Sequence, residues 1–249
     1  NLKAKRLFTD VFYLNYLKYM ANGGLVTNGR SLQQIYRQDI RSFFSKCLTS
    51  TLELYNEITQ LLLEKGLDPR PPSIPYPESV EFIEKQSFIL EGLGRRKQLA
   101  GGEVSQLHFN IQTNQLGAAL ASGFSQVIES NKVRDYILRG KEIAVKHINV
   151  FSDYLENNKL PVPMSYYQEV TTSTEPPFSD KLMLFHYGLM IYSGVANYGA
   201  AISESRRSDL VVDFSRLMTE VLKFAEDGAN LMIANKWLEQ PPLAASLED

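Results

Sequence analysis

Residues 178–194 read FSDKLMLFHYGLMIYSG, and residues 8–24 read FTDVFYLNYLKYMANGG. Both stretches begin with phenylalanine, a hydroxyl residue and aspartate, and both end on a glycine. Their apolar residues recur at spacings of three and four, which is typical of a helix with one buried face. This pair of stretches therefore predicts a helical fold and an internal duplication.

The duplication extends further when each position is compared with the one 170 residues later. Ungapped matches include Gly29 with Gly199, Arg37 with Arg207, Asp39 with Asp209, Phe44 with Phe214, and Pro71-Pro72 with Pro241-Pro242. Agreement over this length is hard to reach by chance. We therefore expect residues near 7–72 and near 177–242 to be two copies of one helical hairpin.

Helix ends and periodicity together place the helices along the chain. Proline-rich exits at 63–72, 155–163 and 233–242 indicate helix ends, because proline cannot continue a helix. Asp39 and Asp209 are expected to be the N-caps of the second helix in each hairpin. The expected helices span about 9–34, 39–65, 103–128, 131–157, 179–203 and 209–236, with a short one near 77–86.

These helices predict an all-α protein with one complete four-helix bundle and one extra helical hairpin. The expected parts are the hairpin at 1–72, a linker at 73–102 and the complete bundle at 103–249. An isolated hairpin would expose an apolar stripe to water, which is unfavourable. We expect the bundle, a partner chain in a homo-oligomer, or an N-terminal segment missing from this sequence to cover it.

Composition argues against several classes of function. The net charge is −2, the pI is near 6.0 and no basic stripe is visible, so no nucleic-acid partner is expected. No apolar run reaches the roughly 20 residues that span a bilayer. The single cysteine, Cys47, cannot form an internal disulfide, which predicts a reducing, cytoplasmic location. The sequence also has no phosphate-binding glycine loop and no nucleophile elbow.

Four stretches carry a resemblance to a known family. The stretches DYILRGKEIAVKHI (135–148), FSDKLMLFHYGLM (178–190), EDGANLMI (226–233) and WLEQPP (237–242) resemble the bacterial domain-of-unknown-function family 3231. The resemblance covers essentially the whole chain and implies tandem ferritin-like helical bundles with no established activity. It also implies that the first copy here is incomplete and lacks its first two helices. The fold expected from it is a ferritin-like up-and-down four-helix bundle plus the extra hairpin.

Candidate chemistry lies in the complete bundle. His108, His147 and His186 are the only histidines, and each falls on a different expected helix. Glu220 and Asp227 lie seven residues apart, and so on one face of the last helix. Imidazole and carboxylate groups that meet inside a bundle can bind iron, zinc or manganese.

The same histidines have a second interpretation as core residues. Ferritin-like dimetal sites carry Glu-x-x-His on two helices, but the residue three before His147 is Ala144. The first copy has Tyr16 in place of His186 and Ser50 in place of Glu220. Buried histidines usually satisfy their hydrogen bonds without any catalytic purpose, so this interpretation is the stronger one.

The connection at 161–177 decides which of these residues can meet. With simple up-and-down connections, the three histidines would gather near one end of the bundle. A ferritin-like crossover would instead place His147 near Glu220, or His186 near Glu142 and Asp227. The connection is long enough to cross a helix of roughly 26 residues, so the sequence leaves both topologies open.

The leading functional interpretation is a helical-bundle protein with a structural or partner-binding role and no catalytic motif. The alternative is a metal-binding ferritin-like protein, with oxidoreductase activity as one outcome, that uses histidines of the second copy. Small residues such as Gly117 and Gly194 are expected to let helices approach closely or to line a cavity.

Overall fold

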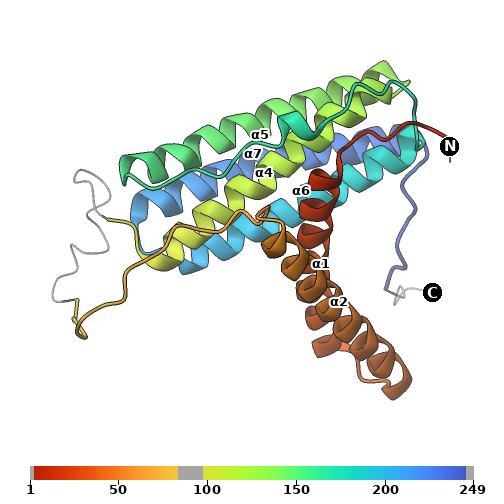
Figure 1. Ribbon diagram of the computed structural model, residues 1–249. Helices are drawn as coiled ribbons and strands as arrows, with labels where there is room; N and C mark the ends of the chain where they lie inside the picture. The colour runs from red at the N-terminus through yellow and green to blue at the C-terminus, as the bar shows by residue number, and fades with distance from the viewer. Residues whose placement is uncertain (1–2, 84–97, 245–249) are drawn as a thin grey trace.

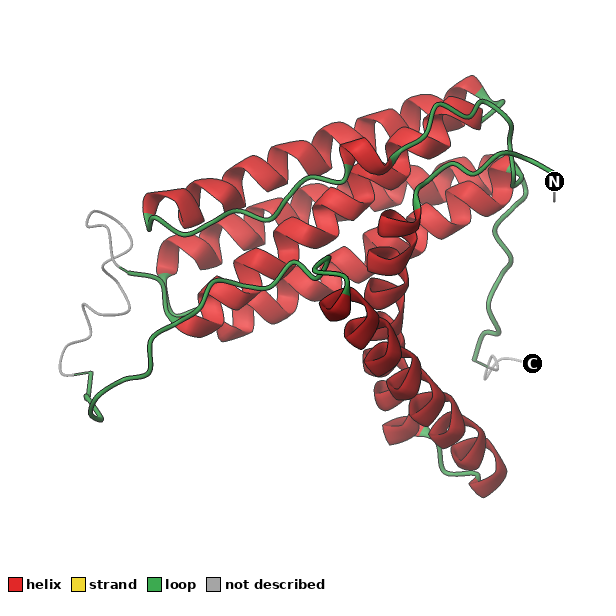
Figure 2. Cartoon of the chain, viewed as in Figure 1, coloured by secondary structure: helices red, strands yellow, loops and turns green. Residues whose placement is uncertain are grey.

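The computed structural model describes residues 3–83 and 98–244. Within these ranges the chain is helical, and the only extended pairing is one bridge between Phe8 and Val170. The all-α prediction is therefore confirmed (Figures 1 and 2). In chain order the elements are α1 Asp10–Gln34, α2 Gln38–Glu64, α4 Gly101–Val127, α5 Asn131–Asn157, the 3-10 helix η2 Tyr167–Glu169, α6 Asp180–Glu204 and α7 Ser208–Ala234.

The long helices end within two residues of the expected positions. Thr9 and Ser179 begin α1 and α6 in the same way, because each hydroxyl accepts a backbone N–H three residues further on. The expected short helix is wrong for residues 77–83, which are not helical, and residues 84–86 lie outside the described ranges. None of the described helices is both long and apolar enough to cross a bilayer.

The starts of α2 and α7 differ from the prediction. Their N-cap residues are Arg37 and Arg207, while Asp39 and Asp209 lie in the first helical turn. Each aspartate accepts two hydrogen bonds from the arginine two residues before it. The negative charge still stabilises the positive end of the helix, so both copies keep one start motif.

Helices α4, α5, α6 and α7 form the four-helix bundle (Figure 1). The connection at 158–179 runs back along the length of the bundle, so α5 and α6 point in the same direction. Of the two topologies that the sequence leaves open, the crossover is the one observed. This connectivity is that of ferritin-like bundles.

The bundle core has two parts. The buried residues of one part all come from α4, α5, α6 and α7 and include Phe151 and Phe214, whose ring centroids lie 4.7 Å apart. The other part includes Phe124 of α4 together with Phe8 and Phe12, which lie at the start of the α1–α2 hairpin. The base of the hairpin therefore shares the bundle core.

Beyond its base, the hairpin projects from the bundle at a steep angle (Figure 2). Ile58 and Leu62 of α2 are buried near the base. Tyr36 and Phe43, at the far end, are mostly exposed. Contacts within the hairpin include the Asn28 side chain, which donates to Thr51 Oγ1 at 3.3 Å. The α1–α2 hairpin is thus held together by its own contacts and exposes several large apolar side chains.

Candidate functional site

His147 is fully buried in α5 and lies at the centre of a polar cluster. Its Nδ1 atom is 2.8 Å from Tyr198 Oη on α6, and its Nε2 atom is 3.1 Å from Glu220 Oε2 on α7. Asn114 on α4 donates to Tyr198 Oη at 2.9 Å. Each of the four bundle helices therefore supplies one residue to this cluster, which we call the His147 cluster.

The protonation of His147 follows from its partners. Burial lowers its pKa, although the hydrogen bond with Glu220 acts in the opposite direction, so the imidazole is neutral at pH 7. A carboxylate only accepts hydrogen bonds, so Nε2 carries the proton that it donates to Glu220. Nδ1 must then accept the Tyr198 hydroxyl proton. Both ring nitrogens are engaged, and a metal ion would have to displace one of these partners.

Glu220 is held as a carboxylate at the edge of the His147 cluster. Burial raises its pKa, but hydrogen bonds from Lys146 and His147 outweigh that effect and leave the pKa lowered. Lys146 Nζ donates to the two carboxylate oxygens at 2.8 and 2.9 Å. Burial also raises the pKa of Tyr198, which stays protonated. The cluster is therefore a satisfied hydrogen-bond chain that links the four helices.

His108 lies apart from this cluster, on the side of α4 that faces the exit of α2. Burial lowers its pKa, while a hydrogen bond to the backbone of Arg70 and the charge of Asp68 oppose that shift. It lines a pocket of about 220 Å³ that also contains the Lys18–Asp68 ion pair, whose N–O distance is 2.6 Å. No second histidine lines this pocket.

His186 lies near the start of α6, toward the opposite end of the bundle from His108. Its Nε2 atom is hydrogen-bonded to the hydroxyl of Tyr16 on α1, and burial lowers its pKa. Asp227 is instead paired with Arg139 at the surface, with an N–O distance of 2.6 Å. His186 thus belongs to the contact between the hairpin and the bundle.

Of the five predicted metal ligands, the structure brings only His147 and Glu220 into contact. The described residues contain no group of three or more His, Cys, Asp or Glu side chains that could hold a metal ion. Sequence reasoning missed Asn114 and Tyr198 as members of the His147 cluster. A signal was available only for Tyr198, which lies among the small residues of 194–201, whereas Asn114 lies in the polar run Gln112-Thr113-Asn114-Gln115.

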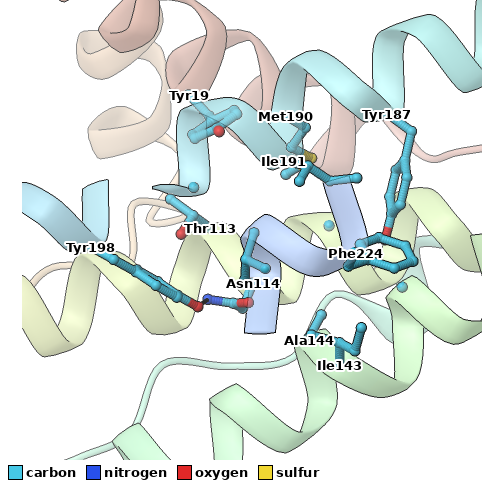
Figure 3. Close-up of a pocket in the computed structure, with 14 residues that line it drawn as sticks. Tyr19, Thr113, Asn114, Ile143, Ala144, Tyr187, Met190, Ile191, Tyr198 and Phe224 are labelled. Atoms are coloured by element: carbon cyan, nitrogen blue, oxygen red, sulfur yellow. Dashed lines mark hydrogen bonds between the residues drawn. The ribbon is translucent and has the colours of Figure 1, made fainter. Parts of the chain in front are cut away.

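A cavity of about 70 Å³ lies in the bundle interior (Figure 3). Its lining is mostly apolar and includes Gly117 and Gly194, so these small residues do border a cavity. Thr113, Asn114 and Tyr198 contribute polar atoms, but no carboxylate or histidine lines it. Ferritin-like dimetal proteins place their carboxylate ligands in the bundle core, so this cavity does not have the donor set of such a centre.

Comparisons with known proteins agree with this geometry. No curated protein matches the chain. A solved structure from Bacillus halodurans C-125, described as "a putative spore coat protein", matches with a TM-score of 0.54 and 18% identity. The match covers 60% of this chain and 98% of that one, and at this identity it shows the shared fold alone. The family model for proteins of unknown function DUF3231 matches residues 1–80 and 87–249, and the chain therefore belongs to the DUF3231 family.

Proposed function

We propose that this protein is a non-catalytic structural protein that acts by binding other proteins through apolar helix faces. The observation that carries the proposal is a stripe on α6. Leu182, Phe185, Leu189 and Tyr192 follow one another at helical spacing, and each is about half exposed. Contiguous apolar surface of this kind usually marks a protein interface.

The polar interior supports the same proposal. His147 has both ring nitrogens in hydrogen bonds, and Glu220 is bound by Lys146 and His147. A catalytic group needs an open position from which it can reach a substrate. The His147 cluster offers none, and its four-helix span suits a role in fixing the arrangement of the helices.

The Bacillus halodurans protein is described as "a putative spore coat protein". A coat is an assembly of proteins, so that description is compatible with a scaffold role for this fold. Because the two chains share 18% identity, we infer from the comparison only that this fold can take part in protein assemblies. We also propose a cytoplasmic location and no nucleic-acid partner, which the lone Cys47 and the net charge of −2 support.

Photo-crosslinking in the cells that make the protein tests this function. A photoreactive phenylalanine analogue placed at Leu189 of α6 or Leu54 of α2 should crosslink to another protein. The same analogue at Asn149, on the exposed side of α5, should not. Crosslinks at all three positions, or at none of them, would contradict partner binding through the apolar faces.

The metal-binding alternative has its own test. Untagged protein should be grown with added iron, zinc and manganese and analysed for bound metal. We expect less than about a tenth of a metal ion per chain, because the candidate ligands do not converge. A stoichiometric metal that His147→Ala removes would instead establish a metal site.

A further inference from the structure

Helices α1 and α6 cross at equivalent residues of the duplication. Tyr16 and His186 are 170 residues apart in the sequence, and their side chains are hydrogen-bonded to each other. In an isologous, two-fold symmetric contact, a residue on the axis meets its own counterpart, as Tyr16 meets His186. The crossing therefore has the geometry of an isologous interface inside one chain.

A groove of about 560 Å³ beside the crossing repeats this symmetry. Every α1 residue that lines it has its 170-residue counterpart on α6 in the same lining. The only other lining residues are Gln106 and Phe109 of α4, which have no counterpart in the groove. The pairs are Tyr19 with Leu189, Asn22 with Tyr192, Gly23 with Ser193, Val26 with Ala196, Thr27 with Asn197 and Arg30 with Ala200.

The two sides of the crossing differ in what covers them. On α1, Phe8 and Phe12 are 3% and 1% exposed, and the Phe8 ring packs against Gly123 of α4. Their counterparts on the α6 side, Phe178 and Leu182, are 48% and 49% exposed. Within the described residues, no helix covers Phe178 and Leu182 on the α6 side in the way that α4 covers Phe8 and Phe12.

The α1–α2 hairpin also has exposed apolar residues whose counterparts in the second copy are buried. Tyr187 and Phe224 are 3% and 5% exposed because they pack beneath Gly140 of α5. Their counterparts on α1 and α2, Leu17 and Leu54, are 45% and 44% exposed. The face of α1–α2 that contains Leu17 and Leu54, which we call the inner face, therefore corresponds to a buried core face of the bundle. No second pair of helices among the described residues packs on it.

We propose that the inner face of α1–α2 and the outer stripe of α6 together form one docking surface for an antiparallel pair of helices of the α4–α5 type. This proposal rests on the proposed partner-binding function and names the partner. A two-fold operation that exchanges α1 and α6 would place such a pair over both faces at once, because α4 packs on α6 and also meets Phe8, beside the start of α1. One occupant therefore accounts for two separate uncovered surfaces.

Charge supports the same occupant. Arg139 of α5 pairs with Asp227 of α7. The counterpart of Asp227 in the hairpin is Glu57, which keeps the negative charge, is exposed and has no ion-pair partner among the described residues. A docked pair of the α4–α5 type would bring its own arginine to Glu57.

A second copy of the chain fits the surface less well. The described residues contain one α4–α5 pair, which already packs on its own α6–α7 hairpin. Pairing of two α1–α2 hairpins would cover their inner faces but would leave the α6 stripe exposed. Self-association is therefore the alternative that the experiment has to separate from the proposal.

Cys47 provides the measurement. It is the only cysteine, it is partly exposed, and its counterpart Leu217 is fully buried in the bundle core. We would extend the full chain by placing a copy of residues 98–170 directly before Asn1, since residue 171 is the counterpart of residue 1. Cys47 in the extended chain should react with a thiol reagent about tenfold more slowly than in the original chain.

Two leucines of α2 give a matched pair of variants. Leu54 lies on the proposed docking surface, whereas Leu52 is exposed and its counterpart Leu222 is exposed as well. In the extended chain, Leu54→Glu should restore fast labelling of Cys47, and Leu52→Glu should not. Circular dichroism would check that both variants keep their helices.

Three results would overturn the proposal. One is equal Cys47 reactivity in the extended and original chains; another is an equal effect of the two glutamate variants. The third is concentration-dependent protection of Cys47 in the original chain together with a dimer in sedimentation, which would assign the surface to a second copy. If the extended chain does not fold, segment 98–170 is added as a separate chain, and unchanged labelling then contradicts the proposal.

This outcome is separable from the test of function. Crosslinks at Leu189 and Leu54 in cells, combined with no protection of Cys47 by the added helices, would keep partner binding and reject this partner. Protection of Cys47 without any crosslink in cells would show the reverse.

Discussion

The α1–α2 and α6–α7 hairpins share one sequence pattern but lie in different surroundings. Phe214 of α7 is fully buried against Phe151, whereas its counterpart Phe44 of α2 is only partly buried. Phe12 of α1 is fully buried, whereas its counterpart Leu182 is half exposed. The duplication therefore conserves the helices, and the neighbours that each copy meets decide which of its faces is buried.

The largest expected difference between the copies is at the matched phenylalanines. Phe214→Ala should lower the free energy of unfolding by about 3–5 kcal/mol, because it leaves a cavity in the bundle core. Phe44→Ala should cost under about 1 kcal/mol, since the side chain already contacts water. Urea unfolding measures both values, and equal losses would mean that the two copies have equivalent cores.

The next largest effect concerns the His147 cluster, which the hairpin lacks. Tyr198→Phe should lower the free energy of unfolding by about 1–3 kcal/mol, because it leaves Nδ1 of His147 without a donor in the core. Asn28→Ala, at the counterpart of Tyr198, should cost about 0.5 kcal/mol, since its hydrogen bond to Thr51 is only partly buried. A neutral Tyr198→Phe would show that the cluster does not hold the helices together.

The decrease in stability at acidic pH should also come from residues of the four-helix bundle. The pKa values of His108, His147 and His186 are all lowered, mainly by burial, from their ordinary value of 6.5. Below pH 6.5 the unfolded chain therefore binds more protons than the native chain, so stability is full above this pH and falls as the pH decreases. His147→Gln should make this fall shallower.

Urea midpoints between pH 7.5 and 5 provide the measurement for this pH dependence. The range ends above the ordinary pKa of glutamate, so the titration of Glu220 does not contribute strongly. The α1–α2 hairpin contains no histidine and should not add to the slope. Stability that rises on acidification from pH 7 to pH 5.5 would contradict the assigned direction.

The smallest effect is expected at the matched aspartates. Arg207 is buried next to the ring of Tyr154, and Asp209 pairs with it at 2.5 Å, so Asp209→Asn should cost about 1 kcal/mol. The Arg37–Asp39 pair is exposed, and Asp39→Asn should cause no measurable change in thermal unfolding. A larger effect at Asp39 would indicate that something covers the far end of the hairpin in solution.

Local patterns were sufficient to predict the helices. Spacings of three and four and proline-rich exits act within a few residues, and the predicted helix ends lie within two residues of those observed. The N-cap assignment at Asp39 and Asp209 was wrong by two residues, because the N-caps are Arg37 and Arg207, and each aspartate pairs with that arginine from inside the first turn.

The candidate site was less predictable. The sequence identified His147 as a core position, and the crossover alternative correctly placed it near Glu220. Asn114 and Tyr198 were not identified, because their contact depends on how α4 and α6 pack across the bundle. His108 and His186 were grouped with His147 by residue type, although they lie at separate places.

The sequence by itself determined that this protein is helical, duplicated and a member of its family, since these properties are recorded in local spacing and in the 170-residue repeat. Only the tertiary structure decided that the connection at 158–179 crosses the bundle and that Tyr16 meets its own counterpart His186. These features depend on which helix faces exclude water from each other. Similar patterns in the two copies leave that choice open. It is made by α4, which packs on Phe8, whereas no described helix covers the counterpart Phe178 in the same way.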